Sequence, residues 1–393
     1  MLATNLRCMS CGSIHELNEK ALVCPKCEGI LDVSYDVEGA RNRFTKESLN
    51  SHARSVWRYR ELLPISEDKY ITSLGEGLTP LKKTSNYGRM IDLTNLSLKL
   101  DYLNPTGSFK DRGTTVSVSK LNQLGISSAM DDSSGNAGVS LAAYCASAKI
   151  ECTLYVPSSI PSEKLVQARI YGAKIEKTSG SRTDVAKAAE KRWKESGLYY
   201  ASHNLSPFFF EGMKTLAYEI AEASNWHVPD HIVFPVGGGT LLAGAWKGFN
   251  ELMTLGWIEH VPKFHCVQSE ACMPIVEAYQ KGSTRVEAVI EGETVAGGIR
   301  ISNPARGWQV LKALRATGGT AISVSDVEIL RHQRLLAGKE GIFAEPTSCA
   351  ALAGLEKLRR TDVIKADEFV LVPLTGFGLK DSKSAAKSLE SVN

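Results

Sequence analysis

Residues 104–113 read Asn-Pro-Thr-Gly-Ser-Phe-Lys-Asp-Arg-Gly, and this run is the best single guide to the fold of the chain. It follows the strand-like run Leu96 to Leu100 and opens a helix-like one. Pro and Gly favour a turn, Ser108 is placed to cap the helix, and Lys110 falls near the helix start. The local field and partial burial at such a position lower the pKa of an amine toward nucleophilic use. A lone lysine in a turn is usually a surface residue, so Lys110 gains meaning only from the motifs that accompany it.

A second polar turn, Asp132-Ser-Ser-Gly-Asn-Ala-Gly138, lies between a strand and a helix predicted over 139–148. Backbone N–H groups at a helix N-terminus attract an anion, and a substrate carboxylate suits this turn. The side chain of Asn136 is placed to hydrogen-bond a ring hydroxyl. An ordinary glycine-containing turn with a cap is the alternative interpretation.

A glycine run, Pro-Val-Gly-Gly-Gly-Thr-Leu over 235–241, follows an apolar strand and precedes another helix. Consecutive glycines let the backbone wrap an anion with several N–H donors, which is the usual geometry for a phosphate. The run has neither the Gly-Lys-Ser/Thr ending of a P-loop nor the spacing of a dinucleotide-binding fingerprint. A bare tight turn is the alternative.

Short apolar runs alternate with amphipathic stretches, such as Asp184 to Ser196 and Asp326 to Ala337, through most of the chain. This alternation predicts an α/β fold in which strands form parallel sheets and helices flank them. The polar turns follow strands, and Thr375 follows the last strand. Its hydroxyl is placed to contact a ligand above the sheet. The alternative is that Thr375 is only a β-branched strand residue before a turn. Open α/β sheets bind their ligands at these carboxyl ends. The strands are predicted over 96–100, 128–130, 151–157, 174–177, 231–236, 263–268 and 368–373.

Four of the nine cysteines form two Cys-x-x-Cys pairs near the N-terminus, Cys8 with Cys11 and Cys24 with Cys27. Four thiolates at this spacing close a tetrahedron around zinc, which a ribbon this short needs because it cannot bury a core of its own. No open coordination position is indicated, so the predicted role of Zn²⁺ is structural. A redox pair and a ribbon that has lost its metal are the alternatives. The other five cysteines lie mostly among apolar residues and do not indicate a disulfide framework.

Length and charge narrow the class of protein. The chain has 393 residues, enough for two packed domains, and 46 basic against 43 acidic side chains give a formal charge of +3 without a basic block. Nucleic acid is therefore not an expected partner. We find no apolar run long enough for a signal peptide or for a membrane span, which takes roughly 18 residues. We expect a soluble, cytoplasmic protein without a membrane partner.

Together these motifs resemble the fold type II family of pyridoxal-phosphate (PLP) enzymes, and most closely the threonine synthases. The likeness covers nearly the whole chain, from the cysteine head through the lysine turn and Ser-Gly-Asn to Gly-Ile-Phe-Ala-Glu-Pro-Thr-Ser-Cys-Ala-Ala at 341–351 and Thr-Gly-Phe-Gly-Leu-Lys at 375–380. The resemblance implies a tryptophan synthase β-like fold with two open, parallel-type sheets, flanking helices and an N-terminal zinc ribbon. It also implies a small-molecule amino-acid substrate and a homodimer.

The resemblance implies that Lys110 is the catalytic residue and forms the Schiff base with PLP. Asn136 then contacts the ring hydroxyl, and Thr375 meets the pyridine nitrogen, where a hydroxyl makes a weaker electron sink that favours elimination or replacement at Cβ and Cγ. The cofactor phosphate is then held by Gly237, Gly238, Gly239, Thr240 and Leu241, and the substrate carboxylate by Ser134, Gly135 and Asn136. The implied reaction converts O-phosphohomoserine and water to threonine and phosphate, with Lys110 as the base for the Cα and Cβ protons.

The chain departs from the family pattern at Phe209. Many threonine synthases carry Asn-Pro-x-Arg-x-Glu-Gly, whose arginine grips the substrate phosphate, but residues 206–212 read Ser-Pro-Phe-Phe-Phe-Glu-Gly. Gly238 also stands where asparagine is common, as in serine and threonine dehydratases. A phenyl ring cannot pair with the phosphate dianion, so another residue must supply the positive charge. The candidates are Lys164, Arg169, Lys214 and Arg300.

Two other functions stay open. One is a related PLP lyase acting at Cβ, either a serine/threonine dehydratase or a β-replacement enzyme, such as a cysteate-synthase-like enzyme on O-phosphoserine. The other is a non-catalytic, zinc-headed binding protein. We interpret His203 and His265 as structural, and Glu345 as either shaping the site or facing a helix dipole. The expected domains are a zinc-ribbon head at 1–35, an arm and the first part of the large PLP domain at 36–124, a smaller mobile domain at 125–225 and the remainder of the large domain at 226–393.

Overall fold

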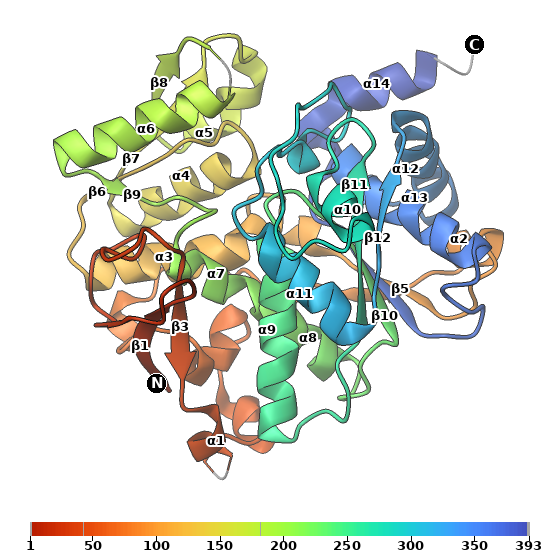
Figure 1. Ribbon diagram of the computed structural model, residues 1–393, viewed down its shortest axis with the longest axis horizontal. Helices are drawn as coiled ribbons and strands as arrows, with labels where there is room; N and C mark the ends of the chain where they lie inside the picture. Colours follow the sequence, from red (N-terminus) through yellow and green to blue (C-terminus); the bar gives the residue numbers. More distant parts are fainter. Residues whose placement is uncertain (1, 42, 181, 391–393) are drawn as a thin grey trace. The chain divides into compact units, whose positions relative to one another are not determined.

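The computed structural model in Figure 1 describes residues 2–41, 43–180 and 182–390. The chain forms two compact units, each built from two segments of sequence. The first unit spans 1–78 and 104–216, and the second spans 79–103 and 217–393. The lysine turn therefore begins where the chain returns to the first unit. The domain boundaries expected from the sequence remain predictions.

The first unit starts with a three-stranded antiparallel sheet in the order β2-β1-β3. Its strands are β1 (Ala3–Cys8), β2 (Ile14–His15) and β3 (Leu31–Tyr35). We call residues 3–35 the ribbon. Short helical turns follow it at α1 (Val37–Ala40), η1 (Glu47–Ser51), η2 (Val56–Leu62) and η3 (Asp68–Tyr70).

The larger sheet of the first unit is parallel throughout, in the order β8-β7-β6-β9. Alternate residues of β7 are buried, because one face of the sheet packs against α4 and its neighbours while the other is partly exposed. The strands are β6 (Ser128–Asp131), β7 (Glu151–Pro157), β8 (Lys174–Thr178) and β9 (Tyr199–Tyr200). The helices are α3 (Lys110–Gln123), α4 (Asn136–Ala148), η5 (Ser162–Leu165), α5 (Val166–Ile170), α6 (Arg182–Ser196) and α7 (Pro207–Met213).

The second unit contains a six-stranded sheet in the order β12-β11-β10-β13-β5-β4, parallel except for β4 at its edge. All residues of β5, β10 and β13 are buried, as expected for central strands covered on both faces. The strands are β4 (Leu81–Lys83), β5 (Leu96–Lys99), β10 (His231–Pro235), β11 (Lys263–Ser269), β12 (Ala321–Val324) and β13 (Val370–Pro373).

The helices of the second unit have clear start and stop signals. α9 (Thr240–Leu255) begins after Gly239, and α12 (Asp326–Glu340) has a capping box between Ser325 and Glu328. The others are α2 (Tyr87–Met90), η4 (Asp101–Leu103), α10 (Pro274–Gln280), η6 (Gly297–Ile299), α11 (Gly307–Thr317), α13 (Pro346–Arg360), η7 (Gly378–Asp381) and α14 (Ser382–Glu390). α8 (Thr215–Ala223) runs from the end of the first unit into the second.

All seven predicted strands are present, and the predicted α/β class is confirmed. The prediction did not include β4, β9, β12 or the strands of the ribbon. Within the described part of the chain, no helix combines the length and the apolar character needed to cross a membrane.

Candidate active site

Lys110 is the first residue of α3, and the loop before it is held in shape by Asp111. The backbone N–H of Thr106 donates to Asp111 Oδ2 at 2.7 Å, and the Thr106 hydroxyl donates to Oδ1 at 2.6 Å. Burial raises the pKa of Asp111 to about 6. The expectation that Ser108 caps the helix is wrong: its hydroxyl is buried and has no hydrogen-bond partner among the described residues. The carboxylate of Asp111 holds the turn instead.

Two aromatic rings flank the amine of Lys110. Its Nζ lies 4.4 Å from the ring centroid of Phe109 and 5.8 Å from that of Phe209 on α7. Phe209 is buried, and its ring packs so closely on α3 that a side chain at Gly113 would collide with it. The residue that replaces the family's arginine is therefore an apolar neighbour of Lys110.

The polar turn at 132–136 lies beside the lysine loop within the first unit. α4 begins at Asn136, with Gly135 at its N-cap, and a side chain at Gly138 would collide with the Ser133 carbonyl. From α4, the Ser140 hydroxyl donates to Asp111 Oδ1 at 2.6 Å. The start of α4 and the start of α3 are thus tied to one carboxylate, and N–H groups at the start of α4 suit an anion.

His203, which the sequence analysis interpreted as structural, lies between a carboxylate and Phe209 in this unit. Its Nδ1 lies 3.0 Å from Asp131 Oδ2, at the end of β6, and its ring meets that of Phe209 edge-on at 6.2 Å. His265, in the other unit, is buried with Nε2 at 2.8 Å from His231 Nδ1, and burial lowers its pKa to about 3. The available signal was that His203 lies only three residues before Ser206, where the Ser-Pro-Phe run begins.

The four candidate cations for a second anion site differ in their surroundings. Lys214 is fully buried, 2.7 Å from Glu211 and 3.6 Å from the centroid of Tyr35. Arg300 lies 2.8 Å from Glu293. Lys164 and Arg169 are exposed, on either side of Gln167, which donates to the Thr106 carbonyl in the lysine loop at 3.1 Å.

In the second unit, the glycine run connects β10 to α9. Gly239 has a φ of +90°, which favours glycine, and a side chain there would lie 2.8 Å from Val310. A side chain at Gly237 would lie 2.8 Å from the Gly298 carbonyl. The chain therefore needs small residues at both positions, and the 16-residue helix α9 presents its N-terminus directly after them. This arrangement fits a phosphate.

Thr375 leaves the same edge of the sheet as the glycine run, because β10 and β13 are adjacent and parallel. Its backbone N–H donates to the Ser348 hydroxyl at 2.8 Å, and its own hydroxyl lies 2.9 Å from that oxygen. Glu345 Oε1 accepts from the Thr375 hydroxyl at 3.4 Å. Ser348 was not predicted, although it lies in the quoted Glu-Pro-Thr-Ser run. The hydroxyl of Thr375 is therefore held by α13.

The predicted site residues thus form two groups. Lys110 and the residues Ser134, Gly135 and Asn136 belong to the first unit, whereas the glycine run and Thr375 belong to the second. Each group combines a strand or helix end with donors suited to the anion or ring predicted there. Taken separately, each group has features that suit a part of PLP: the first contains an amine, and the second contains a helix N-terminus after a glycine run and a buried hydroxyl.

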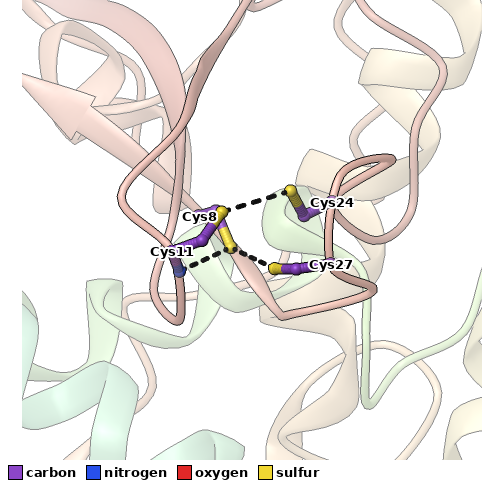
Figure 2. A group of neighbouring side chains, drawn as sticks. All are labelled: Cys8, Cys11, Cys24 and Cys27. Carbon is purple, nitrogen blue, oxygen red and sulfur yellow. Dashed lines mark hydrogen bonds between the residues drawn. The ribbon is translucent and has the colours of Figure 1, made fainter.

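The four cysteines of the ribbon lie together, as Figure 2 shows. Sγ of Cys8 and Sγ of Cys27 are 3.4 Å apart, and those of Cys11 and Cys24 are 3.8 Å apart. A tetrahedral zinc with Zn–S bonds of about 2.3 Å separates its sulfurs by roughly 3.8 Å. Hydrogen bonding with Ser13 lowers the pKa of Cys24 to about 5, whereas the neighbouring thiols of Cys11 and Cys8 raise the pKa of Cys27. The donor set and its spacing fit a structural zinc.

Comparison with protein families identifies the class of protein. A family model described as pyridoxal-phosphate dependent enzyme matches residues 72–376, and the chain belongs to this family. Its fold resembles the processed form of threonine deaminase isoform 2 from Solanum lycopersicum, with a TM-score of 0.70 at 18% identity over 80% of this chain and 83% of that one. It also resembles a fungal L-serine ammonia-lyase from Rhizomucor miehei, with a TM-score of 0.70 at 20% identity over 80% and 98% of the two chains. The fold type II architecture expected from the sequence is confirmed.

Curated relatives narrow this class further. The chain is 39% identical to threonine synthase of Methanocaldococcus jannaschii over 98% of its own length and 95% of that protein. It is 38% identical to threonine synthase of Methanosarcina acetivorans over 97% and 93% of the two proteins. The chain is accordingly a PLP-dependent lyase of the threonine synthase type, as the sequence motifs indicated.

Proposed function

We propose that this chain converts O-phosphohomoserine and water to threonine and phosphate. The observation that carries the proposal is the 39% identity to a threonine synthase over 98% of the chain. The placement of Lys110 at the start of α3, beside an anion-binding turn at the start of α4, supports it. When bound, PLP supplies an electron sink that makes protons at the carbons next to the amino group removable.

The residues of the chain divide the work of holding the cofactor. Lys110 attaches it, the side chain of Asn136 contacts the ring hydroxyl, and the hydroxyl of Thr375 meets the ring nitrogen. The Ser348 hydroxyl orients Thr375 through hydrogen bonds with its backbone N–H and its hydroxyl. The N–H groups of residues 237–241 bind the phosphate, and the N-terminus of α9 adds a favourable dipole.

Lys110 Nζ also moves protons at Cα and Cβ of the substrate. The rings of Phe109 and Phe209 flank the amine and exclude water from it, so that it exchanges protons with the substrate. Ser134, Gly135 and Asn136 bind the substrate carboxylate through N–H groups at the start of α4. Asp111 keeps the two helix starts in register through Thr106 and Ser140.

The leaving phosphate needs a cation, which Phe209 does not provide. We assign this role to Lys164 and Arg169, because both are exposed and flank Gln167, which contacts the lysine loop. Lys214 and Arg300 are less suitable, since each already lies against carboxylates.

Elimination or replacement at Cβ of a serine-like substrate is the second candidate function. The apolar, buried ring of Phe209 beside Lys110 favours it, because such a wall suits a smaller or less charged leaving group. The similarity of the fold to a threonine deaminase and a serine ammonia-lyase is compatible with it but extends to the fold alone.

The zinc site, the cellular location and the assembly are further parts of the proposal. Cys8, Cys11, Cys24 and Cys27 bind a structural Zn²⁺, supported by the separation of their sulfurs. The protein acts in the cytoplasm on a small amino-acid substrate and forms a homodimer, as expected for this family.

The test begins with the visible absorbance of the purified protein before and after Lys110→Ala, with the exposed Lys174→Ala as a control. The band should depend on Lys110 alone. Phosphate and threonine are then measured with O-phosphohomoserine. A band without phosphate release would refute threonine synthesis and direct the assay to serine, threonine and O-phosphoserine. The absence of a band in the parent protein would refute the assigned cofactor site.

A further inference from the structure

The core of the ribbon includes a residue of α7. Leu6, Leu31 and Val33 pack with two of the metal-binding cysteines, Cys8 and Cys24, in one buried cluster. Phe208 of α7 is part of that same cluster and is almost fully buried. The metal site and α7 therefore share a core, although about 180 residues of sequence separate them.

Two ribbon residues, Tyr35 and Asn18, make polar contacts with the same part of the first unit. Nζ of Lys214, just after α7, lies 3.6 Å from the ring centroid of Tyr35 at the end of β3. Asn18 Oδ1 accepts from Lys120 Nζ at 2.8 Å and from Gln123 Nε2 at 3.0 Å, both on the last part of α3. The ribbon thus contacts both α3 and α7.

α3 and α7 pack against each other at the level of their backbones. A side chain at Gly212 would collide with the Arg112 carbonyl, and one at Gly113 would lie 2.7 Å from the Phe209 carbonyl. Close packing of this kind transmits displacement, because it leaves no void to absorb it. A shift of α7 therefore reaches the first turn of α3.

Phe208 and Phe209 connect the two ends of this arrangement. Consecutive helix residues point about 100° apart, since a helix has about 3.6 residues per turn. Phe208 enters the ribbon core, while the ring of Phe209 lies 5.8 Å from Lys110 Nζ. One short helix thus contacts the metal-bearing core through one ring and the catalytic amine through the next.

We propose that the metal-loaded ribbon is a positioning element for Lys110, acting through Phe208 and Phe209 of α7. This inference rests on the zinc assignment made above. Zinc holds the two cysteine pairs and so fixes the core into which Phe208 inserts. That core keeps α7 against α3 and places Phe209 beside the amine. Phe208 acts through Phe209 and is a positioning residue.

The experiment uses the full-length holoenzyme and three readouts: zinc content, hydrogen exchange of residues 207–213, and the visible band of the cofactor on Lys110. Cys27→Ser removes an exposed ligand with little loss of packing. We expect it to lose zinc, to raise exchange in 207–213 by about tenfold or more, and to shift the band. A zinc-free variant with the exchange and the band of the wild type would overturn the inference.

A second pair of variants keeps the test valid if Cys27→Ser does not fold. Phe208→Leu and Phe210→Leu remove the same atoms from neighbouring buried positions, but only Phe208 belongs to the ribbon core. Coupling is reciprocal, so Phe208→Leu should weaken zinc affinity by about tenfold in a chelator competition, and Phe210→Leu should not. Equal zinc affinities in the two variants would refute the coupling.

These outcomes separate the inference from the proposed function. A wild-type protein that retains no zinc would refute the metal assignment and the inference together, even if threonine is formed. A zinc-bearing protein that makes no threonine still reports on the coupling through exchange and zinc affinity, and refutes only the proposed reaction.

Discussion

Asp111 shows how one residue fixes the geometry around Lys110. Its carboxylate accepts from the backbone and the hydroxyl of Thr106 and from the hydroxyl of Ser140, and it is fully buried. Burial raises its pKa from 3.8 to about 6, despite these three donors. The ionised carboxylate is therefore less favoured in the folded protein than in water. Its role is to hold the loop before Lys110 and the start of α4 together.

The raised pKa predicts a pH-dependent cost. Between about pH 4 and pH 6, Asp111 binds more protons in the folded state than in the unfolded chain. The contribution of protonated Asp111 to stability is therefore complete below about pH 4 and is lost as the pH rises through about 6. The loss amounts to roughly 3 kcal/mol. The asparagine in Asp111→Asn cannot ionise, so this variant does not lose that stability. As pH rises from 4 to 7, the free energy of unfolding of the variant should therefore increase by about 2–3 kcal/mol relative to that of the wild type. Urea denaturation at each pH measures this difference.

Asp326 provides the control for this prediction. It also accepts from a threonine hydroxyl and a backbone N–H, but far from Lys110 in sequence and in the other unit. Asp111→Asn should also lower kcat by at least about tenfold, because the lysine loop loses its anchor, whereas Asp326→Asn should not. If the free energies of unfolding of Asp111→Asn and the wild type changed in parallel with pH, this would contradict the raised pKa of Asp111.

The element that connects β10 to α9 is constrained by two effects that substitution can separate. Gly239 and Gly282 both have positive φ, at +90° and +67°, but only Gly239 has atoms close to the space of a side chain. Alanine at either position costs about 1–2 kcal/mol of backbone strain. Gly239→Ala should also weaken PLP binding by at least about tenfold, because Val310 forces the loop to move. Cofactor titration followed by absorbance tests this, and equal affinities in both variants would argue against a phosphate cradle.

The segment 162–170, which covers η5 and α5, carries the cations assigned to the leaving phosphate. Lys164→Ala and Arg169→Ala should each raise KM for O-phosphohomoserine by about tenfold, since a charge-assisted contact to phosphate contributes about 1.5–3 kcal/mol. Lys174→Ala, an exposed lysine paired with Glu151, is the control. Unchanged kinetics in both variants would exclude this segment as the second anion site.

At the scale of the whole molecule, the ribbon and Lys110, the proposed catalytic residue, belong to one unit and the glycine run to the other. Removing zinc should therefore act on one unit first. Under a strong chelator we expect hydrogen exchange to rise in the ribbon and in α3, while β10, β11 and β13 keep their protection. Uniform loss of protection across both units would show that the metal supports the entire fold. Unchanged protection in both would show that it supports neither.

Local patterns were sufficient to predict much of this architecture. Strands such as β7 and β10 are short apolar runs bounded by turns, and helices such as α4 and α12 begin at polar or glycine residues that the chain displays directly. β12, Ala-Ile-Ser-Val, was missed because a run of four residues is too short to show a strand period by itself. It becomes a strand because it pairs with β11, whose position depends on distant sequence.

The site divides in the same way. The motif order indicated the cofactor family and the lysine, and the cysteine spacing indicated the metal site, because turn chemistry and ligand spacing are local properties of the chain. The chain alone did not show that Asp111 rather than Ser108 holds the lysine turn, that Phe209 faces Lys110, or that Phe208 enters the core of the ribbon. The last two contacts join residues about 100 to 200 positions apart. Such contacts form only when every intervening element is folded and packed, so no local rule contains them.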